Sequence, residues 1–129
     1  MSGAYDLPML KIGLIALAAA VGALSRYGIG RAIGVRSFPW ATLGINLSGS
    51  LLLGLIVAIG IARSWSETTT LPLTVGFLGA YTTFSTFSYE TYALMRTDRS
   101  SQAAVYVLVS VIGGVFAAFA GYQIGRGTT

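Results

Sequence analysis

Four long apolar runs, separated by short polar connections, leave this sequence few ways to fold. The runs cover residues 12–30, 40–62, 71–89 and 103–125, and a charged residue, Arg26, occurs only in the first. A helix needs roughly 20 predominantly apolar residues to cross the hydrocarbon core of a bilayer. We therefore predict an all-α membrane protein whose single domain, residues 1–129, crosses the bilayer with four transmembrane helices.

The composition agrees with a membrane location and limits the chemistry. Hydrophobic residues make up 54% of the chain and charged residues 9%, whereas soluble domains carry about 25% charged residues. The net charge of +4 is spread over the connections and forms no basic patch, so we expect no nucleic-acid partner. Cysteine and histidine are absent, which removes disulfides, the commonest metal ligand and the usual general base. We expect no enzymatic activity.

The positive charges are almost evenly divided between the two sides of the membrane. Four crossings put both termini on one side, together with Lys11, Arg63 and Arg126, and leave Arg31, Arg36, Arg96 and Arg99 on the other. Lys and Arg normally concentrate on the cytoplasmic side and set the orientation. The near balance is compatible with a weak preference for one orientation. It is equally compatible with insertion in both orientations, in which case two opposite copies could pair about a two-fold axis in the membrane plane.

The stretch GFLGAYTTFSTFSYE, residues 76–90, is the most polar part of the third run. Glycines and hydroxyl side chains allow a helix to unwind, and unwound backbone is tolerated in lipid only where protein buries it or water reaches it. Interrupted helices expose carbonyl groups near the bilayer centre, where they bind ions. We predict an interruption within residues 76–83 whose carbonyl groups hold a cation.

Two aromatic rings follow the predicted interruption. Phe84 and Phe87 are three residues apart and so share one face of a helix. The edge of an aromatic ring carries partial positive charge and can contact an anion. The alternative is that both rings face lipid or a neighbouring helix.

A few polar residues in the other runs have two interpretations each. Asn46, on a small and polar face with Thr42, lines a polar path or finds hydrogen-bond partners in helix packing. Ser110 lines the path or bonds its own backbone. Arg26 is a functional intramembrane charge or reaches the interface from near a helix end. Glu90 closes the third run and in the simplest reading marks the membrane interface.

Several motifs together resemble the CrcB/Fluc family of fluoride channels. They are TTFSTFS after Gly-x-x-Gly in the third run, GALSRY in the first, PWATLGINLSGSLLLG in the second, and Tyr106 with Ser110 in the fourth. The resemblance extends over essentially the whole chain. One departure is Ala80, where many members carry a second glycine.

The resemblance implies an assembly and a cofactor. Members of this family are antiparallel, dual-topology homodimers of four-span subunits, and their third helix is broken in the middle of the membrane. A structural Na⁺ ion lies where the two breaks cross and is held by backbone carbonyl groups, which correspond here to Gly79 and Thr82.

The resemblance also assigns residues to two fluoride pores in each dimer. The matching pore residues are Asn46, Thr83, Phe84, Phe87, Tyr106 and Ser110. Phe84 and Phe87 would present ring edges to the ion and Asn46 would donate a hydrogen bond. Arg26 corresponds to an arginine near the aqueous vestibule, and Glu90 to a carboxylate at a helix end.

These features predict a multi-pass channel of the inner membrane through which fluoride leaves the cytoplasm passively. The spans contain no His, Asp or Lys to carry protons, and Glu90 is placed at an end, so we expect proton-independent flow. A four-span, dual-topology multidrug exporter is the main alternative, but it needs a carboxylate in the first span, where Arg26 is the only charge. A non-conducting assembly subunit would not account for Asn46 and the clustered hydroxyls.

Overall fold

The computed structural model describes residues 3–128, with side chains described from Pro8 onward, and this part of the chain is helical except for short connections. No strand occurs among residues 3–128. The elements are α1 (Gly3–Ile33), α2 (Trp40–Ala62), α3 (Glu67–Leu71), the π-helical segment η1 (Pro72–Leu78), α4 (Gly79–Tyr81), α5 (Phe84–Arg96) and α6 (Ser100–Gly127).

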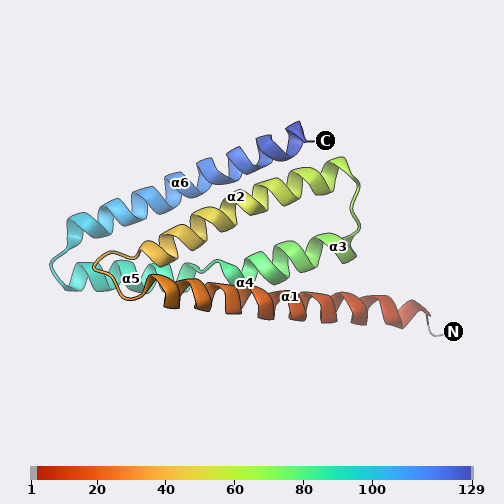
Figure 1. Cartoon of the computed structure of the whole chain (residues 1–129), viewed down its shortest axis with the longest axis horizontal. Coiled ribbons are helices and arrows are strands. Elements are labelled where there is room, and N and C mark those ends of the chain that lie inside the picture. Colours follow the sequence, from red (N-terminus) through yellow and green to blue (C-terminus); the bar gives the residue numbers. More distant parts are fainter. Residues whose placement is uncertain (1–2, 129) are drawn as a thin grey trace.

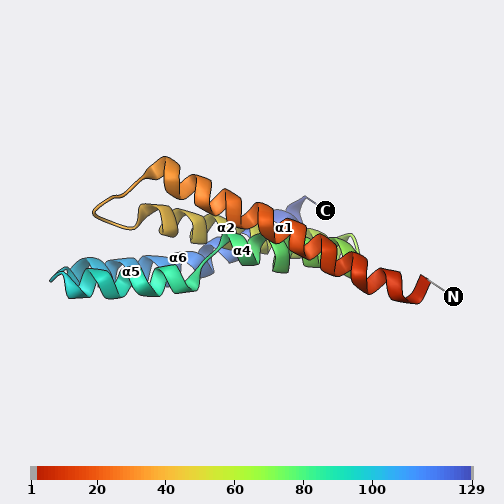
Figure 2. The same cartoon turned by 90° about the horizontal axis from the view of Figure 1, so that it is seen from below.

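Helix α1, helix α2, the segment from α3 to α5, and helix α6 run in alternating directions along one long axis (Figure 1). The beginning of α1 and the end of α6 lie at the same end of the molecule, and the connection between α1 and α2 lies at the other (Figure 1). Towards that second end α1 diverges from α5 and α6, with α2 between them (Figure 2). The η1 and α4 segments pack on α1, whereas α2 and α5 pack on α6.

Three helices within the described chain are long and apolar enough to cross a membrane: Pro8–Ile33, Trp40–Ala62 and Ser100–Gly127. The prediction of an all-helical membrane protein is therefore confirmed at this level. The third run, residues 71–89, is divided instead among several elements and is not one continuous helix. Helical structure also continues beyond the run, because α5 extends to Arg96.

Helices α2 and α6 meet through glycines on both sides. A Cβ atom on Gly54 would overlap the carbonyl group of Ala118, and one on Gly121 would overlap the carbonyl oxygen of Leu51. The two backbones are therefore in direct contact, as is common where membrane helices associate through small residues. This contact accounts for Gly54 and Gly121 as packing residues.

Helix α1 meets η1 in the same way. A Cβ atom on Gly22 would overlap the carbonyl oxygen of Phe77, and one on Gly76 would lie 2.7 Å from the carbonyl oxygen of Ile15. At the terminal end, the Lys11 Nζ atom lies 2.7 Å from Glu67 Oε2, the one ion pair between described residues. The hydrogen bond from Lys11, with its positive charge, holds the pKa of the exposed Glu67 carboxyl below its ordinary value.

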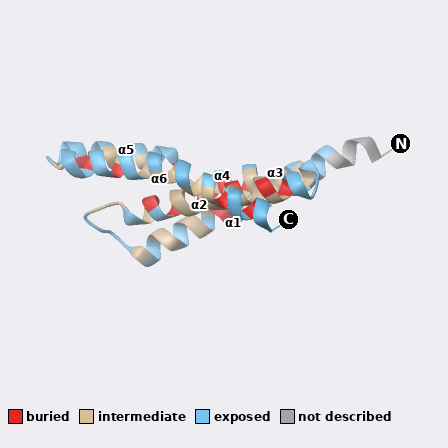
Figure 3. Cartoon of the chain, turned by 90° about the horizontal axis from the view of Figure 1, so that it is seen from above, coloured by how far each residue is buried: buried red, intermediate tan, exposed pale blue. Residues whose placement is uncertain are grey.

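Few residues are buried, and the exposed surface is strongly apolar (Figure 3). Leu17 on α1 and Phe116 on α6 are each about two-thirds exposed. A large exposed apolar surface is expected for helices that contact lipid or another membrane-embedded chain. The buried residues form two small clusters, one around Tyr106 and one around Tyr81.

Candidate functional site

Two consecutive threonines interrupt the helical path between α4 and α5. Thr82 has φ −80° and ψ 160°, and Thr83 has φ −152° and ψ 116°, so both residues are extended. The interruption is shorter than the 76–83 segment predicted from sequence, because Gly76 lies within η1 and residues 79–81 form α4. Gly76 therefore allows η1 to pack closely on α1, and only Thr82 and Thr83 depart from helical backbone geometry.

The interruption frees backbone carbonyl groups at the end of α4. In a continuous helix the Thr83 N–H would bond the carbonyl oxygen of Gly79, but here it donates to Asn46 Oδ1 at 2.9 Å. The last four carbonyl groups before a helix end lack intrahelical partners. Both residues matched to the cation site, Gly79 and Thr82, belong to this group. Gly79 is exposed and Thr82 is half-buried.

Asn46 holds the beginning of α5 with both ends of its amide. Besides accepting from Thr83 N–H, it donates from Nδ2 to the Thr83 carbonyl oxygen at 3.1 Å. Asn46 therefore supplies the partner that the Thr83 N–H has lost, and it adds a bond to the Thr83 carbonyl group, which as the N-cap of α5 also accepts the first hydrogen bond of that helix. Because a primary amide has two N–H groups, one Nδ2 proton is left for another acceptor.

Hydroxyl groups complete the interruption. The Thr83 Oγ1 atom accepts from Thr86 N–H at 3.2 Å and so caps the N-terminus of α5. The same hydroxyl donates to Thr86 Oγ1 at 3.0 Å, and Thr82 Oγ1 donates to the Leu78 carbonyl at 2.9 Å. The Thr83 hydroxyl thus satisfies a backbone N–H group at the beginning of α5.

The aromatic residues after the interruption form a row. The ring centroids of Phe84 and Phe87 are 5.9 Å apart, and those of Phe87 and Tyr106 are 5.1 Å apart. Phe84 is 80% exposed, whereas Tyr106 is fully buried. Phe87 packs against the buried cluster that contains Tyr106. The row therefore runs from the surface of this chain into its interior.

Ser110 lies one helical turn beyond Tyr106 on α6. Its hydroxyl oxygen is buried and has no hydrogen-bond partner among the described residues. The sequence left open whether this hydroxyl bonds its own backbone, and in the structure it does not. A buried hydroxyl without a partner is costly, so Ser110 is ready to bond a group outside the described chain.

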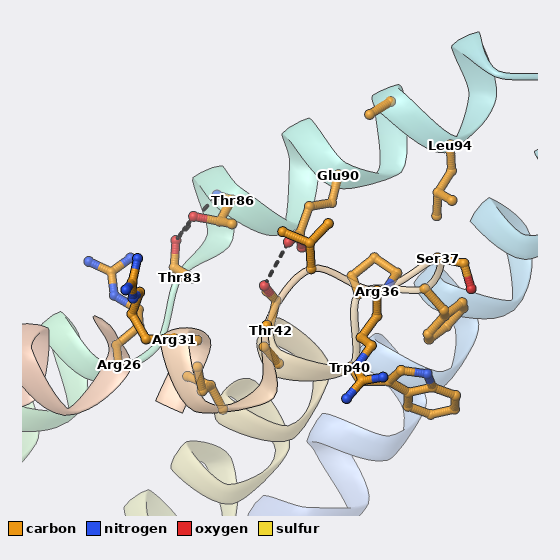
Figure 4. A pocket seen from close by; sticks show the side chains of 18 of the residues that line it. Arg26, Arg31, Arg36, Ser37, Trp40, Thr42, Thr83, Thr86, Glu90 and Leu94 are labelled. Carbon is orange, nitrogen blue, oxygen red and sulfur yellow. Dashed lines mark hydrogen bonds between the residues drawn. The ribbon is translucent and has the colours of Figure 1, made fainter. Parts of the chain in front are cut away.

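Glu90 joins three elements through its carboxylate. Tyr106 donates to Glu90 Oε2 at 2.8 Å, and Thr42 donates to Glu90 Oε1 at 2.9 Å (Figure 4 shows the Thr42 bond). The assignment of Glu90 to a helix end was wrong, because α5 runs from Phe84 to Arg96 and Glu90 lies near its middle. The carboxylate belongs to a partly buried polar cluster.

A cavity of about 800 Å³ lies between α1, the following connection, α2 and α5. Its polar lining includes the hydroxyls of Thr83 and Thr86, the Glu90 carboxylate and the Arg26 guanidinium. Arg31 lines the same cavity as Arg26 and Thr83 (Figure 4). The structure thus brings both predicted vestibule residues, Arg26 and Glu90, to one cavity.

Sequence reasoning missed other residues that line this cavity. Arg31, Arg36 and Ser37 lie on its wall, although the arginines had been considered only as charges that set orientation. Their position within the short connection between the first two runs was the available signal. A second cavity, of about 310 Å³, is lined by Asn46, Gly49, Ser50, Leu53, Thr74, Leu78, Gly79, Thr82, Thr83 and Phe84.

Known proteins resemble this chain over most of its length. The family described as "CrcB-like protein, Camphor Resistance (CrcB)" matches residues 13–122. A protein from Thermus thermophilus named fluoride-specific ion channel FluC is 42% identical over 116 residues, which are 87% of this chain and 92% of the relative.

Two further relatives carry the same name. The protein from Magnetococcus marinus is 42% identical over 121 residues, or 91% of this chain and 98% of the relative. The protein from Geobacter sulfurreducens is 41% identical over 122 residues, or 92% of this chain and 98% of the relative. These relatives are named as ion channels, which agrees with the prediction that the chain is not an enzyme.

The apolar helices and these relatives identify a multi-pass membrane protein. The match to the family covers well over half of the chain, and the motifs that carry the resemblance lie within it or at its edge. The chain belongs to the CrcB family.

Proposed function

We propose that this protein is a passive, fluoride-selective channel that lowers cytoplasmic fluoride. The observation that carries the proposal is the identity of 41–42% with proteins named fluoride-specific ion channels, over about nine-tenths of the chain. The side chains around the interruption support it, because they offer neutral hydrogen-bond donors and aromatic edges in a chain built for the membrane.

The channel is an antiparallel, dual-topology homodimer in this proposal, and η1, α4 and α5 form a fourth, interrupted crossing. Three features support this assembly. The positive charges on the two sides nearly balance. Phe84 is 80% exposed beside the interruption, where a second copy could cover it. The buried Ser110 hydroxyl lacks a partner within the described chain, so a complete site requires an additional group.

A structural Na⁺ ion fits the donor set at the end of α4. The carbonyl groups of Gly79 and Thr82 have lost their helical donors, and oxygen atoms are the ligands that hard cations such as Na⁺ require. No group of three or more His, Cys, Asp or Glu side chains gathers among the described residues, so backbone oxygens are the available ligands. The bound ion would supply positive charge that neutralises these carbonyl dipoles. Two copies would together provide four such oxygens.

Fluoride would follow the row of aromatic and hydroxyl groups on α5 and α6. Phe84 and Phe87 would present ring edges to the ion. Asn46 offers its remaining Nδ2 proton, and Ser110 offers an unpaired hydroxyl. These donors replace water around a strongly hydrated ion without a fixed charge to trap it, and permeation needs binding weak enough for release.

Thr83 and Tyr106 stand beside this row with their hydroxyls already engaged. Thr83 Oγ1 donates to Thr86, and the Tyr106 hydroxyl donates to Glu90. Each must exchange its present acceptor to bond fluoride, which makes them transient donors in the path. Arg26 and Glu90 line the 800 Å³ cavity, which we assign as the aqueous vestibule.

The direction of transport follows from the location that we propose, the inner membrane. Weakly acidic HF enters the cell, dissociates at cytoplasmic pH and leaves as the anion through the channel. The membrane voltage, negative inside, drives an anion outward with about 2.3 kcal/mol per charge for each 100 mV.

Flux from liposomes tests the proposal and its rivals. The purified full-length protein should release trapped fluoride without a proton gradient. Release at the same rate in symmetric buffers of different pH would support proton-independent flow. This measurement is needed because Glu90, a group that can carry a proton, lies within α5. Drug–proton exchange would instead identify an exporter, and the absence of any flux would identify an assembly subunit.

A further inference from the structure

Tyr81, the last helical residue before the interruption, is anchored by its hydroxyl. Its side chain is buried, and its ring stacks on Phe77 with centroids 5.6 Å apart and planes inclined by 9°. The Tyr81 hydroxyl oxygen lies 2.9 Å from Ser48 Oγ on α2. The pair joins residues that are 33 positions apart in the sequence.

The direction of this hydrogen bond follows from counting protons. Ser48 Oγ donates to the Ile45 carbonyl oxygen at 3.1 Å, and a serine hydroxyl has one proton. Tyr81 must therefore be the donor to Ser48. The result is a directed chain from Tyr81 through Ser48 to Ile45. Because this chain is partly buried, loss of either hydroxyl leaves the other short of a partner.

Another contact from α2 reaches the same segment. A Cβ atom on Gly49 would overlap the Thr82 methyl group and lie 3.3 Å from Tyr81 Cδ1. Gly49 thus lets α2 approach the interruption closely enough for the Ser48–Tyr81 bond to form.

One turn of α2 therefore holds both sides of the interruption. The Asn46–Thr83 bonds hold the beginning of α5, and the Ser48–Tyr81 bond holds the end of α4. Tyr81 immediately precedes Thr82 and follows Gly79 by two residues. A shift of the Tyr81 backbone would reorient both carbonyl groups.

We propose that Ser48 and Tyr81 are positioning residues that fix the direction of the Gly79 and Thr82 carbonyl groups and thereby set the affinity for Na⁺. The inference rests on the proposed function, in which these carbonyl groups hold a Na⁺ ion. Neither side chain touches the ion or fluoride. Their effect is exerted through the point at which α4 ends.

The test compares Tyr81→Phe, Ser48→Ala and the double variant in the purified full-length protein. The measured quantity is the NaCl concentration that gives half of the maximal thermal stabilisation, with choline chloride holding ionic strength constant. Tyr81→Phe keeps the buried ring and removes only the donor. Each single variant should raise this concentration by roughly tenfold, in line with the loss of about one buried hydrogen bond. The double variant should raise it no further, because both changes break the same bond.

Two matched variants complete the test. Ser48→Thr keeps a hydroxyl and should restore the wild-type Na⁺ requirement. Tyr89→Phe removes a hydroxyl from a tyrosine that is 70% exposed and should leave the requirement unchanged. Hydrogen exchange should also become several times faster at residues 82–86 in Tyr81→Phe, because the end of α4 is released.

Equal destabilisation of the variants with and without Na⁺ would overturn the inference and reduce the pair to a packing contact. Additive effects in the double variant would overturn it as well. A wild-type protein that conducts fluoride but gains no stability from Na⁺ would refute the inference while leaving the channel intact. A wild-type protein that is stabilised by Na⁺ but conducts no fluoride would refute the proposed function. In that case the Na⁺ requirement of the variants would still decide whether Ser48 and Tyr81 position the carbonyl groups.

Discussion

The side-chain amide of Asn46 pairs with both the N–H and the carbonyl group of Thr83, at 2.9 and 3.1 Å. This two-point contact gives the Thr83 N–H the partner that it loses where the helix stops, and it adds a second bond at the carbonyl group. It explains how a chain can leave helical geometry inside an apolar environment, where each unsatisfied backbone group costs several kcal/mol.

Replacing Asn46 with Ala should therefore weaken the fold as well as transport. The variant leaves the buried Thr83 N–H unpaired and removes one of the bonds to the Thr83 carbonyl, and we expect a loss of about 1–3 kcal/mol of stability together with most of the fluoride flux. Thermal unfolding in detergent and liposome flux measure the two effects. Ser88→Ala is the control, because the Ser88 hydroxyl bonds only the Phe84 carbonyl of its own helix. An Asn46→Ala protein as stable as the wild type would contradict the role of the Asn46–Thr83 hydrogen bonds in holding the beginning of α5.

The two phenylalanines should differ in their effect on stability but not in their effect on flux. Phe84→Ile and Phe87→Ile each remove a ring edge and should cut fluoride flux strongly while the dimer stays folded. Phe87→Ile should also cost about 1 kcal/mol, because Phe87 packs on the buried cluster, whereas Phe84 is 80% exposed in the isolated chain.

Size-exclusion chromatography and liposome flux test the two substitutions. Phe116→Ile on α6 provides a matched control, since Phe116 is exposed and lies away from the aromatic row. Unchanged flux in both Phe84→Ile and Phe87→Ile would remove these rings from the pore.

Ser110 allows stability to be separated from transport. Because its buried hydroxyl has no partner among the described residues, Ser110→Ala should leave stability unchanged or raise it by about 1 kcal/mol. If the hydroxyl bonds fluoride, the same variant should lower flux. Thermal unfolding and flux measured on one preparation decide the point, and a stable variant with wild-type flux would exclude Ser110 from the path.

The contact between α2 and α6 should not tolerate added volume. Gly121→Ala places a methyl group against the Leu51 carbonyl, so we expect a loss of about 1–3 kcal/mol or a failure to assemble. Gly44→Ala is a matched control, because a Cβ atom there would meet nothing within 4 Å. Thermal unfolding of the two purified variants provides the comparison. Equal stabilities of Gly121→Ala and Gly44→Ala would mean that α2 and α6 can move apart at this contact without loss of stability.

The ion pair between Lys11 and Glu67 predicts a small dependence on pH. The pKa of Glu67 is lower in the folded chain than its ordinary value of 4.5, so folding gains stability above that value and loses it as pH falls through the lowered pKa. Glu67→Gln should reduce the difference in melting temperature between pH 7 and pH 3. Because Glu67 is exposed, the effect should be small and should shrink at high salt. If Glu67→Gln showed the same dependence of melting temperature on pH as the wild type, the ion pair would not contribute to stability.

The sequence was most informative where a single physical property decides the outcome. The length and apolarity of residues 40–62 predict a spanning helix, and α2 has those bounds. The candidate site was harder to predict from the sequence, because its geometry depends on contacts between residues that are far apart in the chain. Glycines and hydroxyls spread over residues 76–90, and only the contacts from Asn46 single out Thr82 and Thr83 as the residues that leave the helix.

Glu90 shows the same limit. Its charge suggested the end of a span, because an isolated carboxylate is costly in a membrane. The structure supplies Thr42 from α2 and Tyr106 from α6, so α5 can carry the charge near its middle. No local pattern in the sequence predicts hydrogen-bond donors for Glu90 that are 48 and 16 positions away.

The packing of the segments on either side of Thr82 and Thr83 has a mechanical consequence. Because η1 and α4 are fixed to α1 while α5 is fixed to α6, these two extended residues are the covalent bridge from one rigid block to the other. A tilt of one block against the other would therefore strain these two residues together with the Ser48–Tyr81 and Asn46–Thr83 bonds that α2 makes on either side of them.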